Sequence, residues 1–432
     1  MKKTTGNSEG AHGGNEGIGR GRFLAGAAAV GVTGVAGAVL PGGMAAASGR
    51  RAARREAASA RLGGGGRGLA HRGVVYTLGA GETPGTAFST ARMRRDVRVI
   101  RDELHADTLD VTGDGVERLT ATAAEAAERG LHVWLQPTLG DVPERDILDH
   151  LAETGRFAER LRRQGASVDL SVGCEFWLYV PGILPGDTVL DRVQHRLDGT
   201  YDPVRTQRRL DRFTARAAKV GRSVFRGRLS YAAAADDEVD WNLFDVVGID
   251  YYGYHRRQAD YVRDLRQYLR RGKPLALTEF GTCAYRGAPE TGGMGWAIVD
   301  YAKDPPEIKG NPVRSERTQA AYLVDVLEAC ESMGLYAAMA FEFVTPDAPH
   351  RPDSPRHDLD LASYAITKPL KDHPDDPGSD WHWEPKEAFH ALARQYGRRC
   401  RAQGQYTSSS GRSPVARKRD TVSSPHALPL AR

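Results

Sequence analysis

Two glutamates stand at the ends of apolar segments and are well suited to chemistry. Glu279 lies in PLALTEFGT (274–282), and Glu175 lies in VDLSVGCEFW (168–177). Two carboxyl groups that flank a glycosidic bond can hydrolyse it, because one donates a proton to the leaving oxygen while the other attacks the anomeric carbon. The pair therefore favours glycoside hydrolysis. The alternative for Glu279 is a buried structural carboxylate that is paired with a base.

Eight short apolar segments, alternating with helical patterns, can position these glutamates. Strand–helix alternation predicts a parallel sheet with helices on its faces. Eight strands in about 270 residues match a single (β/α)8 TIM barrel of the α/β class. An open doubly wound sheet is the alternative, but the first turn lacks the GxGxxG fingerprint of that fold. The apolar segments are 73–78, 106–112, 131–137, 168–177, 227–233, 245–254, 274–282 and 336–344.

Polar and aromatic residues gather at the carboxyl ends of these segments, where TIM barrels bind their ligands. Aromatic rings beside carboxyl groups suit a carbohydrate substrate, since rings can stack on sugar faces. The tryptophans and Tyr252 would otherwise be core residues, and Glu342 is a rival second acid. The residues expected to contact substrate are Tyr76, Trp134, Gln136, Cys174, Trp177, Asp250, Tyr252, Tyr285, Trp296 and Glu342.

The strand ends resemble those of clan A glycoside hydrolases, which are TIM barrels. SVGCE (171–175) resembles the small-x-G-N-E motif of strand four, and LTEFGT (277–282) resembles the T-E-F/W-G motif of strand seven. DVVGIDYYGY (245–254) resembles the strand-six pattern G-I-N-Y-Y. The resemblance covers roughly residues 72–397. It implies a retaining β-glycosidase with Glu175 as acid/base and Glu279 as nucleophile, the latter hydrogen-bonded by Tyr252.

A narrower resemblance concerns FDVVGIDYYGY, LTEFGTCAYRGA and the ending W-x-P-K-E-A-F. These stretches look similar to actinobacterial barrels that are named abortive infection proteins. The resemblance implies a role in phage defence as an alternative function, with no chemistry attached to it.

Several positions depart from the clan A pattern. Cys174 stands where the family places an asparagine that holds the sugar 2-hydroxyl, and a thiol is a poor hydrogen-bonding group. Asp110 and Thr112 stand near the place of a strand-two arginine, and Asp250 replaces an asparagine. Phe341 precedes Glu342 where a tryptophan is expected. These departures keep open a catalytically decayed barrel that binds carbohydrate without cleaving it.

The basic balance of the chain comes from its ends. The 432 residues carry a formal net charge of +5, but residues 71–397 hold 42 Lys and Arg against 51 Asp and Glu. An acidic body is a poor candidate for nucleic-acid binding, which requires a basic face. We therefore expect a carbohydrate partner and no nucleic-acid partner. The sequence carries no signal of an oligomeric state.

The N-terminal residues resemble an export signal. A polar lead ends in GRGRFLAG, an apolar run follows at 23–40, and Ala45-Ala46-Ala47 offers a small-residue cleavage site. The long lead favours the twin-arginine type, although a glycine separates its two arginines. The protein would then be secreted or held at the cell envelope, with no stable membrane span after cleavage. An uncleaved anchor or a disordered extension is the alternative.

This interpretation divides the chain into four parts. Residues 1–47 would be the Tat-like signal peptide and 48–70 a flexible linker. Residues 71–397 would form the barrel, and 398–432 a disordered basic tail.

The four cysteines indicate neither a zinc site nor a disulfide framework, because no CxxC spacing occurs. No glycine-rich phosphate loop, HExxH or GxSxG motif is present either. We therefore expect no metal and no cofactor. Cys174 and Cys283 are interpreted as small buried fillers near the site.

Overall fold

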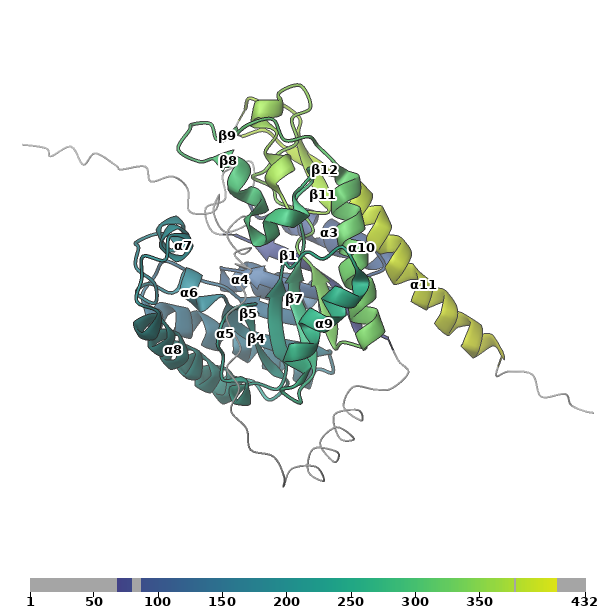
Figure 1. Ribbon diagram of the computed structural model, residues 1–432. Helices are drawn as coiled ribbons and strands as arrows, with labels where there is room; N and C mark the ends of the chain where they lie inside the picture. Colours follow the sequence, from purple (N-terminus) through teal and green to yellow (C-terminus); the bar gives the residue numbers. More distant parts are fainter. Residues whose placement is uncertain (1–67, 80–86, 377, 410–432) are drawn as a thin grey trace, which may run out of the picture.

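Eight parallel strands close into a barrel at the centre of the molecule (Figure 1). The computed structural model describes residues 68–79, 87–376 and 378–409. β1 closes the barrel by pairing with both β2 and the last strand. Each strand overlaps one of the predicted apolar segments, so the (β/α)8 barrel is confirmed. The barrel strands are β1 (His71–Leu78), β2 (Thr108–Gly113), β3 (His132–Pro137), β4 (Val168–Cys174), β5 (Leu229–Ala234), β6 (Val247–Tyr251), β7 (Leu275–Phe280) and β10 (Ala337–Ala340).

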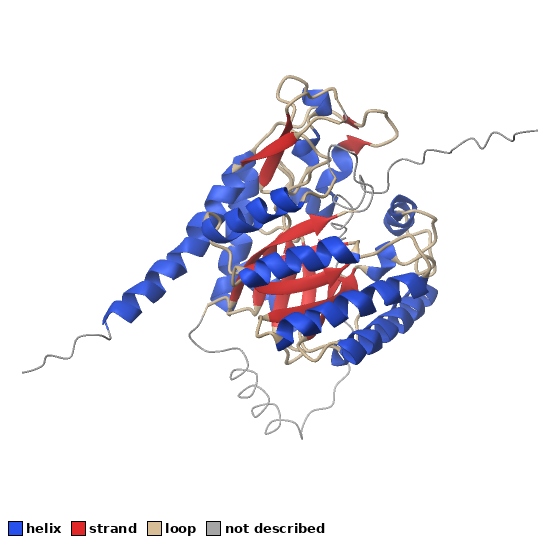
Figure 2. Cartoon of the chain, turned by 180° about the vertical axis from the view of Figure 1, so that it is seen from behind, coloured by secondary structure: helices blue, strands red, loops and turns tan. Residues whose placement is uncertain are grey.

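Helices surround the barrel and bury the outward faces of its strands (Figure 2). Two short helices, α6 (Phe176–Tyr179) and α7 (Val189–Leu197), follow β4 before the chain reaches its next long helix. The surrounding helices are α3 (Thr90–Asp102), α4 (Val116–Glu128), α5 (Glu144–Arg163), α8 (Pro203–Val224), α9 (Gln258–Leu269), α10 (Glu316–Met333) and α11 (Glu387–Ser409).

Side-chain caps determine where several helices begin. Ser89, Asp202 and Ser315 each accept a hydrogen bond from a backbone N–H in the first turn of α3, α8 and α10, respectively. Such caps satisfy donors that have no partner inside the helix. Gly334 ends α10 with φ of 63°, a left-handed conformation that glycine adopts without a steric penalty. The chain therefore turns sharply between α10 and β10.

The amino-terminal end of the barrel is filled by side chains. Tyr336 donates a hydrogen bond to Asp169 at 2.5 Å. The rings of His71 and His132 stack with 4.2 Å between their centroids, and Trp134 lies deeper with its ring tilted against Tyr336. Side chains of the described residues thus occupy this end, and the opposite, carboxyl end of the strands is where TIM barrels bind their ligands.

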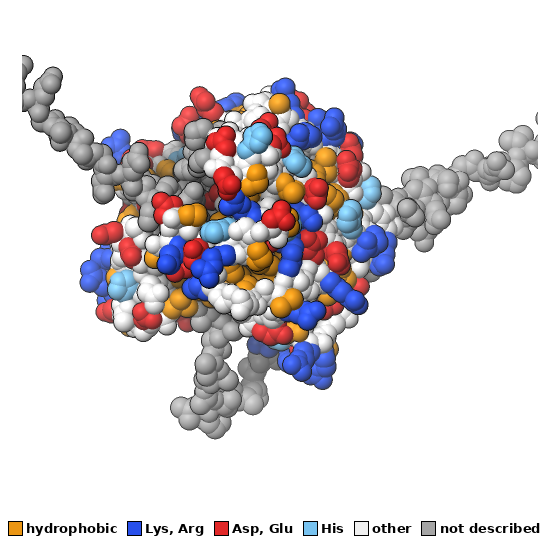
Figure 3. All heavy atoms as spheres, turned by 90° about the horizontal axis from the view of Figure 1, so that it is seen from above, with side chains coloured by type: hydrophobic (Ala, Val, Ile, Leu, Met, Phe, Trp, Pro, Cys, Tyr) orange, Lys and Arg blue, Asp and Glu red, His pale blue; other side chains and the backbone are white. Residues whose placement is uncertain are grey.

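The loops that follow β7 and β10 form a cap region on one side of the barrel (Figures 1 and 2). On the face of Figure 3, which is seen from above, basic and acidic side chains are interspersed. The elements of the cap region are η2 (Pro289–Ile298), β8 (Val299–Asp300), β9 (Glu307–Ile308), η3 (Pro355–His357), η4 (Leu359–Ala362), β11 (Thr367–Lys371) and β12 (Trp381–Pro385); a further turn, η1 (Trp241–Leu243), follows β5.

A partly buried ion-pair network holds the cap region to the helices. Arg314 pairs with Glu316 at 2.8 Å, with Asp358 at 3.4 Å and with Asp360 at 2.7 Å. Lys386, which is fully buried beside the start of α11, lies 2.8 Å from Asp360. We call these five residues the cap network. Each of its acids faces a cation, which is the usual condition for burying a charge.

The predicted chain ends are only partly described. The export signal (1–47), most of the linker (48–67) and residues 410–432 lie outside the described residues. Residues 398–409, which were assigned to the tail, belong to α11. Within the described ranges, no helix combines the length and the apolar character that crossing a bilayer requires.

Candidate active site

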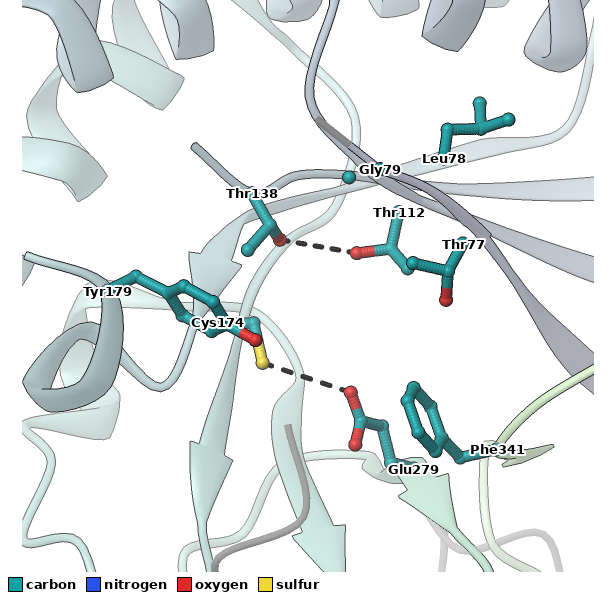
Figure 4. A pocket seen from close by; sticks show the side chains of 10 residues that line it. Thr77, Leu78, Gly79, Thr112, Thr138, Cys174, Tyr179, Glu279 and Phe341 are labelled. Carbon is teal, nitrogen blue, oxygen red and sulfur yellow. Dashed lines mark hydrogen bonds between the residues drawn. The ribbon is translucent and has the colours of Figure 1, made fainter. Parts of the chain in front are cut away.

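A hollow with about 340 Å³ of empty space opens at the carboxyl ends of the strands (Figure 4). Figure 4 shows Cys174, Tyr179 and Glu279 around one space, with threonines on the opposite wall. The hollow is lined by Thr77, Leu78, Gly79, Thr112, Gly113, Thr138, Cys174, Tyr179, Glu279 and Phe341.

Glu279 lies near the end of β7 and lines the hollow. Its Oε2 accepts a hydrogen bond of 2.5 Å from the Tyr252 hydroxyl, and its Oε1 lies 3.9 Å from the Cys174 sulfur. Burial raises the pKa of Glu279 well above its usual value, and the neighbouring Asp250 and Glu175 raise it further. The hydrogen bond from Tyr252 opposes this shift, because it stabilises the ionised carboxylate.

Glu175 follows β4 directly and is fully buried. Its backbone N–H bonds to the carbonyl of Ala232 on β5, and its φ of 32° and ψ of 62° are left-handed. Neither carboxyl oxygen has a hydrogen-bond partner among the described residues. Left-handed backbone costs a non-glycine residue about 1–3 kcal/mol, and such residues cluster at functional sites. The local structure therefore retains an unpaired acid in a costly conformation.

The surroundings of Glu175 favour its protonated form. Burial raises the pKa of Glu175 well above its usual value, and the charges of Asp250 and Asp237 raise it further. Arg196 opposes this effect. The Arg196 guanidinium lies 4.1 Å over the ring of Trp177 and pairs with Asp237 at 3.4 Å. Burial raises the pKa of Asp237 itself to about 7, although Arg196 lowers it.

Asp250 and Cys174 connect the ends of β6 and β4. The Asp250 Oδ1 accepts a hydrogen bond of 2.7 Å from Thr278, and the Cys174 thiol donates to Oδ2 at 3.5 Å. Burial raises the pKa of Asp250 to about 7, while these two hydrogen bonds lower it. Burial, followed by the charges of Asp250 and Glu279, raises the pKa of the Cys174 thiol well above its usual value. The sulfur therefore remains a thiol at neutral pH.

Asp110 is a further buried acid near the site. It is fully buried on β2, and both of its carboxyl oxygens lack a hydrogen-bond partner among the described residues. Burial raises the pKa of Asp110 well above its usual value, and Asp250 raises it further. We call Asp110, Glu175, Asp250 and Glu279 the barrel-mouth acids.

The remaining predicted residues occupy three kinds of position. Tyr252 and Glu342 lie at the mouth. The carboxyl oxygens of Glu342 accept hydrogen bonds from Thr77 at 2.5 Å and from Thr345 at 2.7 Å. Burial raises the pKa of Glu342 to about 8. Within the barrel, Gln136 donates to Thr112 at 3.3 Å. The other predicted residues are buried and do not line the hollow: Trp134, Trp177, Tyr285 and Trp296.

Tyr76 lies away from the hollow. Its hydroxyl donates to Asp96 of α3 at 2.9 Å, so the ring packs between the barrel and a helix. The neighbouring Thr77 lines the hollow instead. Successive side chains of a strand point to opposite faces, so a shift of one residue decides which of them reaches the site.

The sequence placed Thr112 and Tyr179 near the ends of their strands without assigning them to the site, and Thr77 and Thr138 of the lining were not identified. Thr77 could have been found by counting alternate positions back from the end of β1. Tyr179 lies in the short helix α6, which the apolar pattern did not separate from its strand.

Comparisons with known proteins complete the description of the site. Neither a family model nor a curated protein matches the chain. The GH113 β-mannanase of Alicyclobacillus acidocaldarius has a TM-score of 0.47 at 15% identity, covering 76% of this chain and 97% of that chain. For β-glucuronidase 2 of Bacteroides uniformis the TM-score is 0.48 at 14% identity, over 77% and 35% of the two chains. The GH2 β-galacturonidase of Eisenbergiella tayi has a TM-score of 0.45 at 17% identity, covering 77% of this chain and 51% of that chain. Similarity at this level assigns no activity, substrate or catalytic residue to this chain.

Proposed function

We propose that this protein is an exported retaining glycoside hydrolase that cleaves a β-linked glycan. The observation that carries the proposal is a pair of buried glutamates at the ends of β4 and β7, neither of which is hydrogen-bonded to a cation among the described residues. Buried carboxyl groups are costly without such a partner, and enzymes retain them where they do chemistry.

Glu279 would be the nucleophile. Tyr252 fixes one carboxyl oxygen and favours the ionised state, while the other oxygen remains directed towards Cys174 at the hollow. Attack by this oxygen on the anomeric carbon would break the bond to the leaving group and form a glycosyl ester. The short hydrogen bond from Tyr252 would keep the carboxylate oriented during the attack.

Glu175 would be the acid/base. Its buried surroundings raise the pKa of the carboxyl group and favour its protonated form, whose proton would be donated to the leaving oxygen as the glycosidic bond breaks. In the second step the resulting carboxylate would take a proton from water, which attacks the ester on Glu279. Departure of Glu279 then returns both residues to their starting protonation states.

The substrate would be a carbohydrate whose reacting sugar occupies the hollow. The phenol of Tyr179 and the ring of Phe341 provide apolar surface, and Thr77, Thr112 and Thr138 provide hydroxyl groups for hydrogen bonding. The N-terminal pattern, with its apolar run and small-residue cleavage site, supports action outside the cell on a cell-wall or environmental glycan.

A panel of aryl β-glycosides and β-glycans tests the proposal. We expect at least one to be hydrolysed with retention of anomeric configuration, as followed by NMR of the first product formed. Glu279→Gln should abolish that turnover while the variant keeps the melting temperature of the wild type. Hydrolysis that persists unchanged in Glu279→Gln, or an inverted product, would reject the mechanism.

A carbohydrate-binding barrel without catalysis is the second candidate. One observation favours it. Cys174 and Tyr179 line the hollow, whereas Glu175, the acid/base that catalysis would require, does not. This candidate predicts that calorimetry detects glycan binding which Tyr179→Ala weakens, and that no member of the panel is cleaved. A phage-defence role rests on the resemblance of three sequence stretches alone, and a plaque assay with Glu279→Gln would show whether it depends on this site.

A further inference from the structure

Three side chains from separate strands bring potential metal ligands together at the base of the hollow. The Cys174 sulfur, one oxygen of Asp250 and one oxygen of Glu279 all lie within 4.8 Å of one another. The sulfur is 3.5 Å from Asp250 Oδ2 and 3.9 Å from Glu279 Oε1. Cys174 and Glu279 line the hollow, so an ion could reach them from solvent.

These separations fit the coordination geometry of zinc. Zn²⁺ binds thiolate sulfur at about 2.3 Å and carboxylate oxygen at about 2.0–2.2 Å, and a tetrahedral arrangement then places sulfur and oxygen about 3.6 Å apart. The two observed sulfur–oxygen separations lie close to that value. A bound ammonium group would instead hold these three acceptor atoms farther apart than zinc does, because its hydrogen bonds are longer than zinc–ligand bonds.

Hydroxyl groups orient the two carboxylates towards the sulfur. Thr278 donates to Oδ1 of Asp250, which leaves Oδ2 facing Cys174. Tyr252 donates in the same way to Oε2 of Glu279, which leaves Oε1 facing the same sulfur. Hydrogen bonds to the non-ligating atom of a ligand are the usual outer support of metal sites.

Asp110 provides a second, independent indication of a cation site. It precedes Thr112, which lines the hollow, by two residues, so its side chain faces the barrel interior beneath the hollow. Both of its oxygens are fully buried without a hydrogen-bond partner among the described residues. The charge of Asp250 raises the pKa of Asp110, and the charge of Asp110 in turn raises the pKa of Glu279. A divalent ion at the three ligands would supply positive charge among the four barrel-mouth acids.

We propose that Cys174, Asp250 and Glu279 bind a divalent zinc ion, with the hollow supplying the open fourth position. Three protein ligands and one open position are typical of accessible zinc sites. On binding, the sulfur–zinc bond forms as the thiol proton leaves to solvent. Zinc held by Glu279 would block its attack on a sugar, so the ion would inhibit the enzyme. Only this inhibition rests on the proposed function.

A second group with the composition of a metal site, His350, Asp358 and Asp360, does not support the same inference. Its carboxylates already pair with Arg314 and Lys386, which supply the counter-charge.

Titration of the full chain, freed of metal with a chelator, tests the site. We expect isothermal titration calorimetry with ZnCl₂ to give about one tight site per chain. CdCl₂ should produce the ultraviolet charge-transfer absorbance of a cadmium–thiolate bond. Cys174→Ser should lose both signals, and Thr278→Val should weaken zinc binding by about 10–100-fold. The matched controls Cys330→Ala and Cys400→Ser should keep both signals.

The outcomes separate the zinc site from the proposed function. Absence of tight zinc binding, or binding that is unchanged in Cys174→Ser and Asp250→Asn, would overturn the zinc site whether or not the protein cleaves glycans. Where a glycoside is cleaved, micromolar zinc should stop turnover and a chelator should restore it. Failure of every glycoside in the panel would reject the proposed function, while the two titrations would still decide the zinc site.

Discussion

The barrel-mouth acids and the cap network bury the same kind of side chain in opposite surroundings. In the cap network, Arg314 pairs with Glu316, and although burial alone would raise the pKa of that glutamate, the pairing lowers it to about 2. At the barrel mouth, Glu279 and Asp250 are bonded by hydroxyl and thiol groups, and their pKa values are raised. Paired acids hold the fold together, whereas acids held without a cation are available to exchange protons, attack carbon or bind an ion.

The largest expected effect is the loss of activity in Glu279→Gln. Removing the nucleophile should lower kcat on the best substrate by roughly 10⁴-fold, as for other residues that form a covalent intermediate. Steady-state kinetics on the purified variant measure this loss. Glu316→Gln, which changes a paired glutamate of the cap network, should keep the kcat of the folded enzyme. Equal losses in the two variants would break the distinction between the clusters.

Glu175→Gln should lower kcat by about 10²–10⁴-fold, because general acid catalysis contributes that much. The loss should shrink for aryl glycosides with acidic leaving groups, which depart without protonation. The alkaline fall of the kcat/KM profile should also disappear, since the wild-type enzyme loses activity as the raised pKa of Glu175 is passed. A variant that shows the same loss for every leaving group would remove Glu175 from this role.

Lys386→Met tests the cap network through stability. The lysine and its partner Asp360 are both fully buried, so removing the cation leaves a buried carboxylate less compensated. We expect the free energy of unfolding to fall by about 3–5 kcal/mol, as measured by urea denaturation. Folded protein should keep its kcat. A loss below about 1 kcal/mol would show that the pairing contributes little.

Asp110→Asn should change stability in a pH-dependent way. The raised pKa of Asp110 means that the folded protein holds this proton more tightly than the unfolded chain does. The contribution of this proton to the free energy of unfolding is fully present below the ordinary pKa of 3.8. It is lost as the pH rises towards the raised pKa of the folded state. The melting temperature of the variant should therefore decline less than that of the wild type between about pH 4 and pH 8. Parallel declines would contradict the buried, unpaired state of Asp110.

The barrel could be predicted because each of its strands is a short apolar segment and the long helices lie between them. Glu175, Glu279 and Tyr252 could be selected because they stand at or just beyond the carboxyl ends of β4, β7 and β6. The two-residue strands β8 and β9 were not predicted, since so short a strand shows no periodicity.

Side-chain direction and long-range contacts could not be obtained in this way. Tyr76 and Thr77 are neighbours in sequence, yet only Thr77 reaches the hollow, because the register of β1 decides the face. Cys174 and Asp250 are 76 residues apart in the sequence, so no short motif indicates the proposed zinc site. The stacking of Arg196 over Trp177 likewise depends on how α7 folds back after β4.

Trapping the glycosyl-enzyme is the most direct test of the proposed chemistry. A 2-deoxy-2-fluoro glycoside with a good leaving group, matched to the best substrate, should inactivate the enzyme and accumulate the covalent intermediate. Peptide mass spectrometry should then place the sugar on Glu279, and Glu175→Gln should not move it. Label on Glu342 or another residue, or continued turnover without any label, would contradict Glu279 as the nucleophile.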